Sequence, residues 1–181
     1  LMPRLLPEID RRFGPDYILH VTHGASDATR FARKASEEGA RLIIAAGGDG
    51  TVHEVINGMF RDRSPVNPHC TLGILDFGTG KGLAQTLALP YSHHVQLNLI
   101  ANAPESPIDI GFISYHDIHG QPCEDLFISE CQIGIGSVVA QKVHTGFKKL
   151  GGTMAFGIVA MAQAIGYRPN DVTFQFDDAA A

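Results

Sequence analysis

The chain has 181 residues, of which 44% are apolar and 18% charged, and its formal net charge is −5. This length can hold one large domain or one and a half small ones, and the lack of a basic excess argues against nucleic acid as a partner. Its three cysteines are widely spaced and include no CxxC pair, so they indicate neither a metal cluster nor a disulfide framework and suit a reducing compartment.

The apolar runs are too short for a membrane span, since none approaches the roughly 18 residues that a bilayer requires. We therefore expect a cytoplasmic protein whose membrane contact, if any, is peripheral at the inner surface.

The N-terminal part predicts a helix, a strand and a second helix. The first helix ends over residues 8–13 at a Gly-Pro pair, and Tyr17–Val21 has the composition of a strand. Ala25–Glu38 is predicted to be helical. Its buried side is expected to hold Ala28, Phe31, Ala32 and Ala35.

The most informative feature is a glycine turn between a buried strand and a helix. Arg41–Ala46 predicts a strand covered on both faces of a parallel sheet, and Val52–Phe60 predicts a helix. The turn between them consists of Gly47, Gly48, Asp49, Gly50 and Thr51. Glycines permit close approach, and the free N–H groups of the first helical turn form an anion site, for which a polyphosphate is the expected ligand. The Thr51 hydroxyl is expected to cap the helix.

A simpler interpretation is that the turn is only a tight connection in which Asp49 bonds its own backbone. The longer pattern GGDGTxxExxNG is less probable by chance, because Glu54 and Asn57 recur at helical spacing on one face. These two side chains either hold the glycine turn to its helix or are solvated. His53 either touches a phosphate or is an exposed residue at a helix start.

A second strand–turn–helix unit follows a proline-rich loop. Leu72–Leu75 predicts a strand, 78–80 a glycine turn, and Gly82–Leu89 and His94–Ala101 two helices. The alternation implies a parallel α/β layer that binds ligands beyond the carboxyl ends of its strands. Both glycine turns fall on that edge and are expected to face one site together.

The pattern changes near residue 105, where we predict the boundary between an α/β domain (1–105) and the incomplete start of a β-rich second domain (106–181). Ile108–Tyr115 and Asp125–Ser129 predict strands joined by a polar loop. Helical patterns at 137–143 and 153–165 and a strand at 172–176 follow.

Taken in order, these motifs resemble the diacylglycerol kinase catalytic-domain family, which includes sphingosine and ceramide kinases and bacterial lipid kinases. The glycine-turn pattern is joined by segments that match the family along nearly the whole chain: His20-Val21-Thr22, Gly78–Ala84, Ile108–Gly111, Phe127-Ile128-Ser129, Gly134-Ile135-Gly136 and Lys148–Gly152.

The resemblance implies a nucleotide-binding fold like that of NAD kinase and diacylglycerol kinase, truncated here at both ends. It implies ATP and Mg²⁺ as cofactors and phosphorylation of a hydroxyl on a diacylglycerol- or sphingoid-like lipid at the membrane surface. Asp49 is the carboxylate expected to orient the metal through water. The residues implied at the ATP site are Thr22, Gly47, Gly48, Asp49, Gly50, Thr51, Val52, His53, Gly78 and Thr79.

The second turn departs from the family pattern GTxND, because Lys81 and Gly82 replace the asparagine and aspartate. If that aspartate helps to position Mg²⁺, metal binding is weakened; Lys81 either meets phosphate charge directly or is a solvated residue of the first helical turn. Asp76 stands where an apolar residue or proline is usual. The family's proton acceptor is expected outside this chain, so residues 1–181 alone are expected to be inactive.

Two alternatives remain open at this stage. An NAD kinase-like enzyme also uses a GGDGT turn, although the Glu54…Asn57 extension and Ile108–Gly111 argue against it. A non-catalytic nucleotide- or lipid-binding module would explain the departures at the second turn. The oligomeric state is also open at this stage, and a homodimer is possible.

Overall fold

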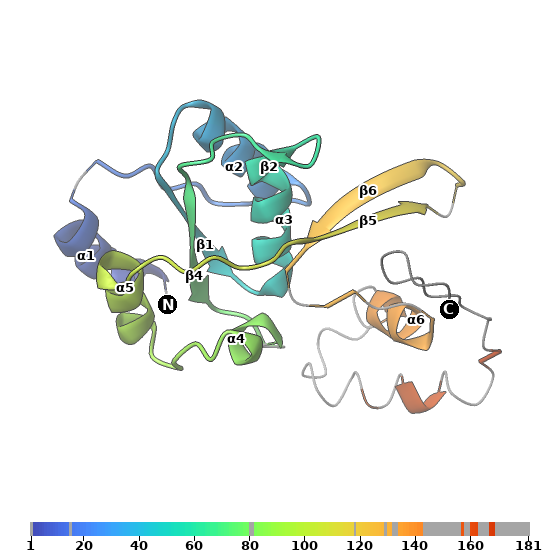
Figure 1. Ribbon diagram of the computed structural model, residues 1–181. Helices are drawn as coiled ribbons and strands as arrows, with labels where there is room; N and C mark the ends of the chain where they lie inside the picture. Colours follow the sequence, from blue (N-terminus) through green and yellow to red (C-terminus); the bar gives the residue numbers. More distant parts are fainter. Residues whose placement is uncertain are drawn as a thin grey trace. The chain divides into compact units, whose positions relative to one another are not determined.

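The computed structural model describes residues 2–14, 16–79, 82–117, 119–128, 130–131, 134–142, 157, 160–162 and 167–168 (Figure 1). The chain forms two compact units, Leu1–Glu130 and Cys131–Ala181. The first unit contains both glycine turns. Within the described part of the second, the main element is α6 (Ile135–Lys142).

Two parallel strands form the centre of the first unit, which confirms the predicted parallel sheet. β1 (Leu42–Gly47) pairs with β4 (Thr71–Asp76), in a register that runs from Leu42 opposite Thr71 to Gly47 opposite Asp76. Because the strands are parallel and in register, their carboxyl ends lie at the same edge. The two glycine turns follow directly from that edge.

One face of the β1–β4 sheet is covered by α2 (Asp27–Glu37) and α3 (Asp49–Met59). The two helices cross closely at Gly58, where an added Cβ would overlap the carbonyl oxygen of Thr29 and lie 2.7 Å from the Cβ of Ala32. The buried core on this face consists of Ala28, Ala32, Ala45, Val52, Val55, Ile56, Met59, Leu83 and Leu126.

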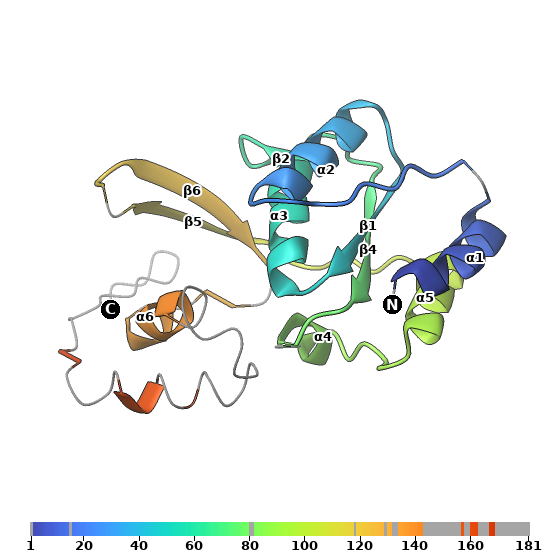
Figure 2. The same ribbon diagram turned by 180° about the vertical axis from the view of Figure 1, so that it is seen from behind.

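The opposite face is covered by α1 (Met2–Phe13) and α5 (His93–Asn102), as Figure 2 shows. Leu5 and Ile9 of α1 and Leu97 of α5 pack there with Leu75 of β4. Along β1, Ile43 and Ala45 belong to the first core, and Ile44 and Ala46 pack against the second. Burial on both faces explains why this strand is a continuous apolar run rather than an alternating one.

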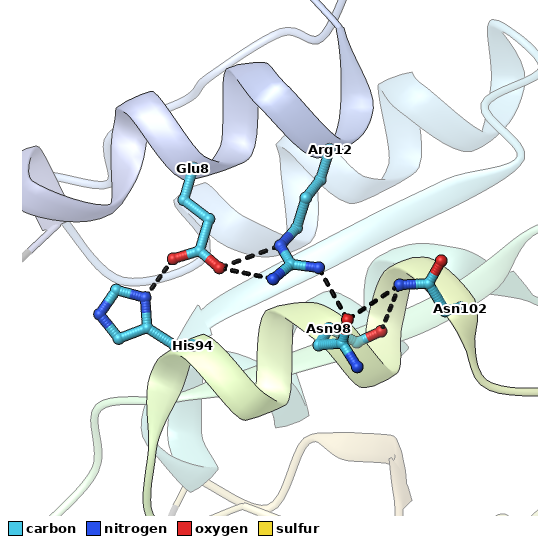
Figure 3. A network of polar contacts seen from close by, with 5 residues as sticks. All are labelled: Glu8, Arg12, His94, Asn98 and Asn102. Atoms are coloured by element: carbon cyan, nitrogen blue, oxygen red, sulfur yellow. Dashed lines mark hydrogen bonds and ion pairs between the residues drawn. The ribbon is translucent and has the colours of Figure 1, made fainter.

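A polar network joins α1 to α5 at the rim of the second core (Figure 3). Glu8, only 8% exposed, accepts hydrogen bonds from Arg12 Nε at 3.0 Å and Nη2 at 2.8 Å, and its other oxygen pairs with His94 Nδ1. Arg12 also donates to Asn98 Oδ1 at 2.9 Å. The Arg12 guanidinium and then the His94 ring hold the pKa of Glu8 below its ordinary value.

The remaining described elements of the first unit are two hairpins and a short helix. β2 (Phe60–Arg61) and β3 (Ser64–Pro65) pair as a small hairpin that sequence analysis missed. α4 (Gly82–Thr86) is shorter than predicted. β5 (Gly111–His116) and β6 (Pro122–Phe127) pair antiparallel, and β6 contacts α3.

The predicted strand Tyr17–Val21 is wrong. The segment has no strand partner among the described residues, and three of its side chains are exposed: Ile18 by 76%, Leu19 by 47% and Val21 by 62%. Its β-branched composition favours extended backbone, but a strand also requires a neighbour to take its hydrogen bonds.

The predicted domain boundary at residue 105 stays a prediction. The division of the chain into two compact units falls after Glu130, and it does not test where the domains of the protein begin and end. Most of the predicted helix 153–165 and all of the predicted strand 172–176 lie outside the described residues. The same holds for Lys148–Gly152, Ser129, Gly80 and Lys81. No helix in the described part of the chain has both the length and the apolar character needed to cross a bilayer.

Candidate nucleotide-binding site

The two glycine turns touch through their main chains. A Cβ added at Gly48 would lie 3.0 Å from Gly78 Cα, and one added at Gly78 would lie 2.8 Å from Gly48 Cα. The N–H of Phe77 donates to the carbonyl of Gly47 at 2.9 Å, which extends the β1–β4 pairing into the turns. Glycine is therefore required at both positions by a close backbone approach.

The first turn leaves two amides unbonded at the start of α3. The helix begins at Asp49 with Gly48 as N-cap, and the Gly48 carbonyl accepts from the N–H groups of Thr51 at 2.9 Å and Val52 at 3.2 Å. Within the described residues, the N–H groups of Asp49 and Gly50 have no acceptor. We call these two groups the α3 amide pair. They lie at the positive end of an 11-residue helix, where anions bind favourably.

Thr51 does not cap α3, contrary to the prediction, because the helix begins two residues earlier. The Thr51 side chain instead lies against Gly47, where an added Cβ would overlap it. Glycine is thus required at position 47, because the Thr51 side chain of α3 occupies the space that a Cβ would need.

At and after the second turn, carboxylates accept hydrogen bonds from three backbone amides. Gly78 N donates to Asp76 Oδ1 at 2.8 Å, while Gly82 N donates to Asp49 Oδ2 at 3.3 Å and Leu83 N to Asp49 Oδ1 at 3.4 Å. Asp49 therefore caps α4 and ties the first turn to the second, rather than bonding its own backbone.

Asp76 has a structural role at the end of β4. It is 7% exposed, its N–H donates to Gln96 Oε1 at 2.9 Å, and its carbonyl lies 2.7 Å from His93 Nε2. Gln96 in turn donates to the carbonyl of Pro90 at 2.7 Å. Helix α5 thereby fixes the backbone from which the second turn departs.

Glu54 and Asn57 hold α3 to its neighbours. Both predicted alternatives for these side chains are therefore wrong, since they neither hold the glycine turn to its helix nor are simply solvated. Glu54 Oε2 accepts from the N–H of Ala28, in the first turn of α2, at 3.1 Å. The Asn57 amide accepts from Leu126 N at 2.9 Å and donates to Leu126 O at 3.0 Å, in the manner of a neighbouring strand. Both contacts join segments far apart in the sequence.

His53 is exposed and faces β6. Its Nε2 lies 3.8 Å from Asp125 Oδ1, and Asp125 also accepts a hydrogen bond of 2.7 Å from the Tyr115 hydroxyl. That hydrogen bond raises the pKa of Tyr115 to about 12.

Comparison with protein families gives this geometry its context. Residues 3–113 match the model of the diacylglycerol kinase catalytic domain. The chain belongs to the diacylglycerol kinase catalytic-domain family. A probable YegS-like lipid kinase of Chromohalobacter salexigens is 31% identical over 168 residues, which cover 93% of this chain and 50% of the relative. A diacylglycerol kinase of Bacillus subtilis is 32% identical over 159 residues, which cover 87% and 48%. The chain thus spans about half the length of these relatives.

Not all the residues implied at the ATP site of this diacylglycerol kinase family member come together. Gly47–Thr51 and Gly78 do, and Thr79 is exposed beside them. The Val52 side chain is buried in the core, so only its main chain is available to a ligand. Thr22 is exposed in the unpaired segment, and no bond joins it to either turn within the described residues.

Sequence reasoning missed Asp125 and the structural role of Asp76. Asp125 becomes relevant only because β6 packs on α3, which no local pattern indicates. Asp76 could have been found, since a carboxylate directly before a glycine turn commonly accepts a turn N–H.

Proposed function

We propose that the full-length protein is an ATP- and Mg²⁺-dependent lipid kinase whose nucleotide phosphates bind the α3 amide pair. One observation carries the proposal: a Cβ added at Gly50 meets nothing within 4 Å. Gly47, Gly48, Gly58 and Gly78 are each required by a close protein contact, whereas Gly50 is not. The space above Gly50, beside two unbonded amides, is available to a ligand that approaches the backbone closely.

The α3 amide pair and the open space at Gly50 provide what phosphoryl transfer requires. The γ-phosphoryl group moves from ATP to a lipid hydroxyl, and catalysis consists mainly of holding the groups in line and neutralising charge. The α3 amide pair and the dipole of α3 bind and orient the phosphates. Mg²⁺, when bound, neutralises charge on the phosphate oxygens. We assign no proton acceptor for the lipid hydroxyl among residues 1–181.

The names of the relatives, lipid kinase and diacylglycerol kinase, support a lipid as the substrate. We propose a diacylglycerol- or sphingoid-like substrate taken up at the membrane surface by a peripheral enzyme.

The test is transfer of radiolabelled γ-phosphate from ATP to a panel of diacylglycerols, sphingoid bases and ceramides by the full-length protein. Labelled phospholipid supports the proposal. Tight ATP binding without transfer to any lipid overturns it in favour of a binding module, and formation of NADP from NAD and ATP overturns it in favour of an NAD kinase.

A further inference from the structure

Two carboxylates converge on Gly82, at the start of α4. A Cβ added at Gly82 would lie 3.5 Å from Asp49 Oδ2 and 3.9 Å from Glu130 Oε1. Asp49 begins α3, whereas Glu130 follows strand β6 and is far away in the sequence. In the part of the chain that the structure describes, no Lys, Arg or His pairs with either carboxylate.

The donor set at this point fits Mg²⁺. Magnesium takes oxygen ligands, and in nucleotide sites it is commonly held by one or two carboxylates together with phosphate oxygens and water. Asp49 and Glu130 supply the carboxylates, and the backbone amide of Asp49 belongs to the α3 amide pair, so phosphate oxygens bound there would lie beside them.

We propose that Glu130 supplies the second carboxylate for the nucleotide-bound Mg²⁺, in place of the aspartate that the family pattern carries at position 82. The proposal rests on the proposed function. The absent side chain at Gly82 leaves open the space that the Glu130 carboxylate approaches. The same carboxylate charge is thus restored from a different segment of the chain.

The test measures metal-dependent nucleotide binding by the full-length protein. ATP affinity is determined by calorimetry with Mg²⁺ and with EDTA, and Mn²⁺ binding in the presence of ATP is followed by electron paramagnetic resonance. We expect Glu130→Gln to reduce the gain in ATP affinity that Mg²⁺ confers by about tenfold or more, and to leave affinity in EDTA unreduced. Glu38→Gln is the matched control and should behave as wild type, because Glu38 is an exposed residue at the C-terminal end of α2 whose ion-pair partner is the exposed Lys34.

A rescue variant distinguishes loss of the Mg²⁺ site from misfolding. Gly82→Asp, added to Glu130→Gln, returns a carboxylate to the same place, and its Cβ meets Asp49 only at an ordinary van der Waals distance. We expect it to recover the Mg²⁺ effect. Equal Mg²⁺ dependence in wild type and Glu130→Gln, or no recovery in the double variant, overturns the inference even if the wild type phosphorylates lipid. A Glu130-dependent Mg²⁺ effect without lipid phosphorylation supports the inference and overturns the proposed substrate.

Discussion

Gly50→Ala separates ligand binding from folding at the first glycine turn. The added methyl group enters open space, and Gly50 does not adopt a positive φ, so the substitution introduces no strain. Gly50 is the second residue of α3, where alanine is favoured over glycine by up to about 1 kcal/mol. We therefore expect stability to be unchanged or slightly raised.

ATP binding should respond in the opposite direction. If phosphate oxygens approach the α3 amide pair, a methyl group on the Gly50 Cα crowds them. We expect a loss of about tenfold or more in ATP affinity, equivalent to about 1.4 kcal/mol. Thermal unfolding and calorimetric titration of the same preparation measure the two effects.

Gly47→Ala is the matched control, because its Cβ would overlap the Thr51 side chain. Overpacking of this kind costs about 1 to 3 kcal/mol, so this variant should lose stability. If Gly50→Ala binds ATP as tightly as wild type while remaining folded, phosphates do not lie above Gly50 and the proposed site is wrong.

Three further predictions concern the contacts around the site. Asn57→Ala should lower the free energy of unfolding by about 1 to 3 kcal/mol in urea titrations and speed hydrogen exchange of the Leu126 amide, because that amide loses its acceptor. Asp125→Asn should lower the pKa of Tyr115 from about 12 toward 10, measured by ultraviolet titration of the phenol. The stability advantage of wild type over Glu8→Gln should be present above the ordinary carboxyl pKa of 4.5 and disappear as the pH falls through the lowered folded value.

Each of these predictions has an outcome that contradicts it. Unchanged Leu126 exchange in the Asn57 variant would show that the amide clamp does not form. A Tyr115 pKa that does not move would remove Asp125 as its cause. An advantage of wild type over Glu8→Gln that grows toward low pH would reverse the sign assigned to the α1–α5 network.

The two strand–turn–helix patterns, one around Asp49 and one around Thr79, were sufficient to predict the positions of the two glycine turns. A buried apolar run, glycines and a helical period are local signals, and parallel pairing then brings the turns to one edge without further information. The start of α3 was misplaced because Thr51 is a good capping residue by itself, whereas Gly48 caps without a side-chain bond. Local propensity could not reveal that Thr51 packs on Gly47.

Partners far apart in the sequence could not be predicted. Asp49 caps a helix 33 positions away, and Asn57 bonds a strand 69 positions away. The failure of Tyr17–Val21 has the same origin, since its residues favour a strand but no described strand pairs with it. Side-chain chemistry indicated which residues needed partners, and only the tertiary arrangement identified them.

The pattern GGDGTxxExxNG therefore combines two kinds of constraint. Gly47, Glu54, Asn57 and Gly58 serve packing and hydrogen bonds between α3 and its neighbours, so a protein with the same fold and no kinase activity would also need them. Gly50 and the unbonded amide beside it have no such role in the described structure. It follows that most of the pattern identifies the scaffold, and that evidence for nucleotide binding must come from substitutions at Gly50 rather than from the match as a whole.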